Sequence, residues 1–196
     1  MIKLPQVTLV AVTGLDYQTE EHKEALAKSS IGIEFGAIKL IQLEQIKNID
    51  DWNKAIIYDL PKYIETDYCL LIHADGYVIN PKEWRDEWLK YDFIGAPFPL
   101  PKDDYSYCDI NGKVQRVGNS VSLRSKKLLD VARKRNLEWK AFHGYTNEDG
   151  FISVNYRHIY EEEGCKFAPL EEAVKFGIEH ELPEHKGIKP FLYHQV

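Results

Sequence analysis

The chain has 196 residues, of which 44% are hydrophobic and 29% charged, and this composition predicts a folded chain rather than a disordered one. Its formal net charge of -6 disfavours nucleic acid and anionic lipid as partners, because both attract basic surfaces. No apolar run approaches the roughly 20 residues that a membrane-spanning helix needs, so we expect neither a signal peptide nor a membrane span.

The cysteines predict a reducing environment. Cys69, Cys108 and Cys165 are far apart and lack the paired spacing of a zinc site or a disulfide framework. We therefore expect a cytoplasmic protein, either free or peripheral at the inner face of the membrane. A chain of this length buries roughly 70% of its unfolded surface, so any metal would serve function rather than folding.

The first half alternates predicted strands and helices. Short runs of branched apolar residues predict buried strands at 7–12, 37–43 and 68–73. Helical spacing predicts helices at 19–30 and 50–64, and Pro61 is expected to end the second helix near Leu60. This order favours parallel strands with right-handed crossovers, as in half of a doubly wound nucleotide-binding sheet.

The second half predicts short strands, loops and further helices. We expect a helix that Asn80 caps, with Pro81 in its first position and Glu83 completing a capping box. The remaining predicted elements are strands at 93–96 and 120–124, a hairpin at Asn111-Gly112, a helix from Ser125 to Arg135 and a helix from Asn147 to Gly164.

The first candidate site is the sequence His73-Ala-Asp75-Gly76, which follows an apolar strand. Ligands bind at the carboxyl ends of strands in open α/β sheets, and residues two apart on an extended chain project to the same side. His73 and Asp75 are thus expected to share a divalent cation. The alternative, equally supported by the residues alone, is a turn-forming Asp75 beside a buried His73.

Two further segments carry candidate site residues. Gly118, Asn119 and Ser120 precede a predicted strand and are suited to backbone approach by a ligand or to hydrogen bonds with sugar hydroxyls; the alternative is an ordinary loop. Glu148 and Asp149 begin a predicted helix, where acids are usually helix starters but where an ionised carboxylate is also placed to act as a general base.

Histidine near the carboxyl terminus offers a third metal ligand. His194 lies in a segment that either folds back to complete a metal shell or forms a flexible tail, and both readings are equally supported. The other five histidines have no persuasive partners at metal spacing: His22, His143, His158, His180 and His185.

Taken in order, five segments resemble a bacterial and viral family of small glycosyltransferase-like proteins, once catalogued only as a domain of unknown function (DUF5672). The segments are residues 7–14, 49–99, 117–129, 147–152 and 166–179. The resemblance implies a nucleotide-diphosphate-sugar transferase of the GT-A type. It also implies an α/β fold in which residues 1–196 form a single Rossmann-like domain, with a mostly parallel central sheet flanked by helices and a mixed carboxyl-terminal half.

The resemblance also implies roles for particular residues. The Asp-x-Asp-type motif reads His73-Ala74-Asp75 here, so Asp75 matches the acid that binds Mn²⁺ or Mg²⁺, while a histidine stands where a carboxylate is common. His194 corresponds to a carboxyl-terminal metal ligand of some such transferases.

Substrate-binding and catalytic roles follow from the same resemblance. It places Thr13 and Asn53 beside the nucleotide base and ribose, Ala74 and Gly76 beside the donor, and Gly118, Asn119 and Ser120 in an acceptor-side loop. Asp149 is implied as the base of an inverting transferase and Glu148 as its sugar-orienting partner. Residues 1–97 then form the nucleotide-binding half and residues 98–196 the acceptor and catalytic half.

We thus expect a sugar transferase that uses a nucleotide-diphosphate donor and a carbohydrate or lipid-linked acceptor in surface polysaccharide biosynthesis. A non-catalytic sugar- or nucleotide-binding module is the alternative, favoured by His73 and by Ser120-Val121 where many relatives carry two glycines. A nucleotidyltransferase is disfavoured, because only Gly14 and no nearby cation follow the first strand.

Overall fold

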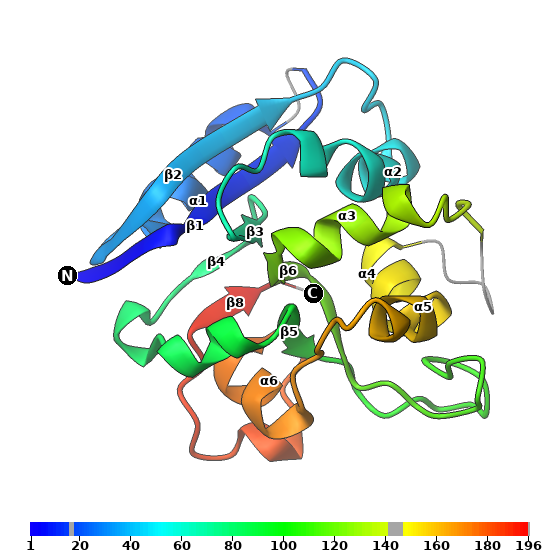
Figure 1. The fold of residues 1–196 in the computed structure, drawn as a ribbon. Helices are drawn as coiled ribbons and strands as arrows, with labels where there is room; N and C mark the ends of the chain where they lie inside the picture. The colour runs from blue at the N-terminus through cyan, green and yellow to red at the C-terminus, as the bar shows by residue number, and fades with distance from the viewer. Residues whose placement is uncertain (16–17, 141–146, 196) are drawn as a thin grey trace.

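The computed structural model describes residues 1–15, 18–140 and 147–195 (Figure 1). The strands are β1 (Ile2–Thr13), β2 (Ile33–Gln42), β3 (Tyr68–Ile72), β4 (Gly76–Val78), β5 (Phe93–Pro97), β6 (Val117–Ser125), β7 (Gly177–Ile178) and β8 (Leu192–His194). The α-helices are α1 (Thr19–Ser29), α2 (Ile49–Tyr58), α3 (Lys126–Lys134), α4 (Glu148–Gly150), α5 (Arg157–Glu162) and α6 (Leu170–Phe176). None of the helices in these residues is long and apolar enough to cross a membrane.

The main sheet has the strand order β2-β1-β3-β6-β5. Strand β1 pairs in parallel with β2 and β3, whereas β6 is antiparallel to both of its neighbours. This arrangement confirms the predicted α/β class and the mostly parallel central sheet. It also places the carboxyl ends of β1 and β3 at one edge, where a ligand can reach both.

Side chains from β1 and β3 are buried on both faces of this sheet. Leu9 and Leu70 pack on the face that α1 covers, and Val10 and Leu71 pack on the face that α2 covers. A strand covered on both faces has no polar side to display, which explains the unbroken apolar runs in the sequence.

A second sheet has the order β4-β8-β7 and includes the last strand of the chain. Strand β8 is antiparallel to β4, with His194 opposite Gly76, and parallel to β7, with Tyr193 opposite Ile178. The backbone N–H of Gln195 adds a hydrogen bond of 3.0 Å to the carbonyl oxygen of Asp75. The carboxyl-terminal segment is therefore a paired strand rather than the flexible tail that was the alternative.

The predicted helix after Asn80 is wrong. The chain forms two 3₁₀ turns instead, at Pro81–Glu83 and Asp86–Lys90. Asn80 makes no capping bond, because its side chain donates to the carbonyl oxygen of Pro190 at 2.7 Å. The tryptophan of the second turn, Trp88, packs among the rings of Trp84, Phe176 and Phe191, so tertiary contacts prevail over the local helix signals here.

The other predicted elements are largely confirmed. Helix α2 ends at Tyr58, and Pro61 lies in a 3₁₀ turn at Leu60–Lys62, as its missing N–H requires. Ser125 caps α3 by accepting a hydrogen bond from the N–H of Leu128. The helix predicted from Asn147 to Gly164 is interrupted by a π-helical turn at Phe151–Asn155, and Asn147 itself makes no capping bond.

Gly76 permits the close contact between β4 and its surroundings. A Cβ atom at this position would lie 2.4 Å from Cγ2 of Val121 and 2.7 Å from Cδ2 of His194. Both distances are far below van der Waals contact, so a side chain here would push β8 away from β4.

We therefore predict that Gly76→Ala destabilises the protein by about 1–3 kcal/mol, the usual cost of overpacking a well-packed site. Denaturant unfolding of the variant and the parent measures the difference. A free energy of unfolding equal to that of the parent would contradict the packing described here.

Candidate functional site

A cavity of about 610 Å³ opens at the carboxyl ends of β1 and β3. Its lining comes from the end of β1, the start of α1, the loop before α2, Trp52 of α2 and the turn after β3. The predicted site residues Thr13, His73, Ala74 and Asp75 all line it. A cavity of this size suits a small-molecule ligand or cofactor.

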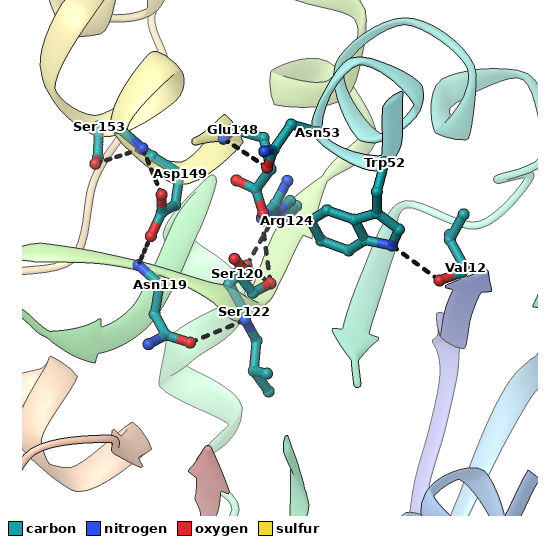
Figure 2. Close-up of polar contacts among 12 residues, drawn as sticks. Val12, Trp52, Asn53, Asn119, Ser120, Ser122, Arg124, Glu148, Asp149 and Ser153 are labelled. Atoms are coloured by element: carbon teal, nitrogen blue, oxygen red, sulfur yellow. Dashed lines mark hydrogen bonds and ion pairs between the residues drawn. The ribbon is translucent and has the colours of Figure 1, made fainter. Parts of the chain in front are cut away.

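Trp52 forms a rigid wall of this cavity. Its indole N–H donates a hydrogen bond of 2.9 Å to the carbonyl oxygen of Val12, as Figure 2 shows. The edge of the ring contacts His73, with the ring centroids 4.8 Å apart. A tryptophan held at both ends in this way offers a fixed apolar surface to a planar ligand.

Three ligand-type side chains come together where β8 pairs with β4: His73 and Asp75 line the cavity, and His194 of β8 lies beside them. Asp75 Oδ1 lies 4.0 Å from Nδ1 of His73 and 3.7 Å from Nε2 of His194. One potential ligand atom from each residue lies within 4.8 Å of the other two. Among the residues that the structure describes, these three form the group able to hold a metal ion.

The protonation state of His73 favours metal binding, because the neutral form of its ring is preferred. The pKa of His73 is well below its usual value, first because burial disfavours the imidazolium ion and then because His194 is close. A neutral imidazole keeps a lone pair for a cation, and the half-exposed carboxylate of Asp75 supplies negative charge. The residues present thus fit a divalent ion with two nitrogen ligands and one oxygen ligand, a donor set that favours transition metals over Mg²⁺.

Asp149 lies on α4 and is not among the residues that line the cavity. Its Oδ2 accepts a hydrogen bond of 3.1 Å from the backbone N–H of Asn119, and its Oδ1 accepts one of 2.7 Å from the N–H of Gly150 (Figure 2). Burial and, to a smaller extent, the neighbouring negative charge of Glu148 raise the pKa of this carboxyl to about 7. Asp149 therefore exchanges its proton near neutral pH, which is what a general base requires.

Glu148 forms a buried ion pair. Its Oε1 lies 3.0 Å from Nη2 of Arg124, and neither side chain has any exposed surface. Arg124 also donates to the Ser122 hydroxyl at 2.9 Å and to the Ser120 carbonyl oxygen at 3.2 Å (Figure 2). The charge of Glu148 is thus directed at Arg124, and the predicted contact with a sugar would require this pair to open.

Asn53 takes part in the same buried network. It is 2% exposed, and its Oδ1 accepts a hydrogen bond of 3.1 Å from the N–H of Glu148. It is not among the residues that line the cavity. Its observed role is to tie α2 to α4, and the predicted contact with a nucleotide stays a prediction.

The segment Gly118-Asn119-Ser120 lies inside β6 rather than in a loop before it. A Cβ atom on Gly118 would lie 1.9 Å from Cζ of Phe98, so this glycine makes room for a ring. Asn119 has a φ of 82° and is 2% exposed, with its side chain accepting from the N–H of Val121 at 2.9 Å. Packing therefore accounts for the small residues, and only Ser120 is partly exposed.

Strand β6 joins the two parts of the site. The backbone N–H of Asn119 donates to Asp149. Two residues further along the strand, Val121 packs against Gly76, which is paired with His194. The possible metal ligands and the possible base thus lie beside one short stretch of β6, between Asn119 and Val121. Sequence spacing alone does not show this, because the four segments are far apart in the chain.

Sequence reasoning missed Glu179 and the contacts of two histidines. Glu179 Oε1 lies 3.2 Å from Nδ1 of His194, and its Oε2 lies 3.7 Å from Nε2 of His180. His22 is buried and lines the cavity. Strand β7 has two residues, too few to be predicted from its sequence, so no local signal gave Glu179 a role. Of the other histidines considered in the sequence analysis, His143 lies outside the described residues.

Comparison with solved structures shows a glycosyltransferase-like fold. A glycosyltransferase involved in the glycosylation of the major capsid of PBCV-1 matches with a TM-score of 0.58 at 11% identity, over 95% of this chain and 92% of that chain. The apo form of the glycosyltransferase GlyE of Streptococcus pneumoniae TIGR4 matches with a TM-score of 0.46 at 11% identity, over 97% of this chain and 54% of that one.

The sequence itself defines the family. The model of the family described as protein of unknown function (DUF5672) matches residues 38–194, so the chain belongs to that family. No curated protein matches the sequence. The predicted family is therefore confirmed, together with a glycosyltransferase-like fold.

We predict that Glu148→Gln destabilises the protein by about 3 kcal/mol or more, since it leaves the buried charge of Arg124 without its partner. Denaturant unfolding measures this, with Glu44→Gln as a control at an exposed acid. The double variant Arg124→Met/Glu148→Met should lose less than the single variant, because it removes both charges. Equal stability of Glu148→Gln and the control would contradict a strong pair.

A second prediction concerns the pH dependence of stability. Because the pKa of Asp149 is higher in the folded protein than its ordinary value of 3.8, folding takes up a proton between these two values. As the pH rises from about 4 to about 7, the parent should therefore lose about 1.4 kcal/mol of stability relative to Asp149→Asn for each pH unit.

The measurement is unfolding of both proteins across this range, with the exposed Asp104→Asn as control. The parent and Asp104→Asn should change in parallel. A parent whose stability relative to Asp149→Asn stays constant or increases as the pH rises would show that the carboxyl is not held protonated.

Proposed function

We propose that this protein is an inverting, metal-dependent glycosyltransferase of the GT-A type. It moves a sugar from a nucleotide-diphosphate donor to a carbohydrate or lipid-linked acceptor in surface polysaccharide biosynthesis. The observation that carries this proposal is the group of His73, Asp75 and His194, of which the first two line a cavity of about 610 Å³, at the end of the sheet where Asn119 of β6 also holds Asp149. Family membership and the fold support it.

In this proposal residues 1–97 bind the donor. The cavity accepts the nucleoside, with the Trp52 ring as an apolar wall and Thr13 and Ala74 in its lining. The diphosphate extends toward Asp75, at the cavity mouth. Residues 98–196 supply the acceptor side, His194 and the base, within a single domain.

A divalent cation would be held by Asp75, His73 and His194. When bound, it supplies Lewis-acid stabilisation of the negative charge that develops on the departing diphosphate. The two imidazole ligands favour Mn²⁺ over Mg²⁺, because imidazole suits transition metals better than the harder magnesium ion.

Asp149 is the proposed base. In its ionised form it removes the proton from the acceptor hydroxyl as the oxygen attacks the anomeric carbon, and the diphosphate leaves from the opposite face. The Asn119 and Gly150 N–H groups hold the carboxylate in place and favour its charged form. Arg124 opposes the repulsion between Asp149 and Glu148.

The test is turnover of a panel of nucleotide sugars with Mn²⁺. We expect nucleotide release with one of them, and a loss of about 100-fold or more for Asp75→Asn and for Asp149→Asn. The rate should rise with pH through an apparent pKa near that of Asp149, about 7. Asp104→Asn is the matched control.

Two outcomes would contradict the proposal. If no nucleotide sugar is bound or hydrolysed, and Asp75→Asn behaves like the parent, the protein is not this transferase. If a donor is bound without transfer, and Asp149→Asn binds it with the affinity of the parent, the non-catalytic binding module is the better account.

A further inference from the structure

We propose that Glu179 is a positioning residue that holds His194 in the tautomer able to bind a cation. This inference rests on the proposed function, because it concerns the metal ligand His194. It assigns a role to a residue that lies at the end of the segment 166–179 but to which the sequence analysis gave none.

The topology of the small sheet brings Glu179 to His194. Strands β7 and β8 are parallel, with Ile178 opposite Tyr193, so the next residue of each strand, Glu179 and His194, reach the same end of the sheet. On the other side of β8, Gly76 of β4 is opposite His194 and is preceded by Asp75. Three adjacent strands thus place one carboxylate on each side of the His194 imidazole.

The distances favour one tautomer of that imidazole. Glu179 Oε1 lies 3.2 Å from Nδ1 of His194, whereas Asp75 Oδ1 lies 3.7 Å from Nε2. Nδ1 is fully buried, and it has no hydrogen-bond partner of good geometry in the described part of the chain. The carboxylate of Glu179, with Oε1 at 3.2 Å, is the acceptor that lies beside Nδ1.

Burial makes this contact selective. The side chain of His194 is 13% exposed and that of Glu179 is 20% exposed, whereas Asp75 is 55% exposed. A carboxylate with little water around it attracts a neighbouring N–H more strongly than an exposed one. His180 Nε2, 3.7 Å from Oε2, adds a further polar group on the far side of the Glu179 carboxylate.

The chemical consequence is a prepared ligand. With the proton on Nδ1, the lone pair of Nε2 points toward Asp75, where a cation would be shared. A carboxylate that accepts from the second nitrogen of a metal-binding histidine fixes the ring orientation and raises its basicity, and removing it commonly costs 10-fold to 100-fold in metal affinity.

The first measurement is calorimetric titration of the protein with Mn²⁺ alone. We expect Glu179→Ala to bind Mn²⁺ 10-fold to 100-fold more weakly than the parent. Glu179→Gln, whose amide oxygen can still accept from Nδ1, should recover part of the loss. The exposed neighbour Glu181→Ala is the matched control and should bind like the parent.

The second measurement reads the tautomer of His194 in the metal-free protein by long-range ¹H–¹⁵N correlation spectroscopy. We expect the proton on Nδ1 in the parent and in Glu181→Ala, and a mixture or the opposite tautomer in Glu179→Ala. A proton on Nε2 in the parent overturns the inference, and so does an unchanged tautomer in Glu179→Ala.

These measurements separate the inference from the proposed function. If the parent binds no Mn²⁺, the metal-dependent transferase fails, and the tautomer still decides whether Glu179 positions His194. If the parent binds Mn²⁺ and Glu179→Ala binds it equally well, the transferase survives and the role of Glu179 is overturned.

Discussion

The pairing of β8 with β4 is the constraint on which the site depends. It carries His194 across the molecule to the turn after β3, where the chain contributes His73 and Asp75. The pairing is possible because residue 76 is a glycine, since the space for a side chain is occupied by Val121 and His194. One strand of three residues therefore joins the carboxyl-terminal segment to the turn at the edge of the main sheet.

A buried network of polar contacts supports the other half of the site. Arg124 and Glu148 neutralise each other inside the protein, and the backbone N–H of Glu148 is held by Asn53 of α2. Because Asp149 follows Glu148 directly, this network determines where the carboxyl of Asp149 lies and contributes to its raised pKa. The two adjacent acids thus differ in their surroundings: Glu148 has no exposed surface and is paired with Arg124, whereas Asp149 is 8% exposed and accepts hydrogen bonds from two backbone N–H groups.

Much of the fold was predictable because its signals are local. The apolar runs of β1, β2 and β3 and the hydroxyl cap of Ser125 each act within a few residues of the chain. The 3₁₀ turns that replace the predicted helix after Asn80 were not predictable, because Asn80 contacts Pro190 and Trp88 contacts Glu172, which are 110 and 84 residues away. Glu179 was missed for a different reason, because its partner His194 lies on the neighbouring strand of a sheet whose strands, of two or three residues each, leave no pattern in the sequence.

The central claim is that Asp75 and His194 share a cation beside the bound diphosphate. The most direct measurement is a crystal structure with Mn²⁺ and uridine or guanosine diphosphate, with the metal located by its anomalous scattering. The account predicts a single strong peak between Asp75 and His194, in contact with the diphosphate oxygens. A diphosphate bound elsewhere, or a peak remote from these two side chains, would contradict it.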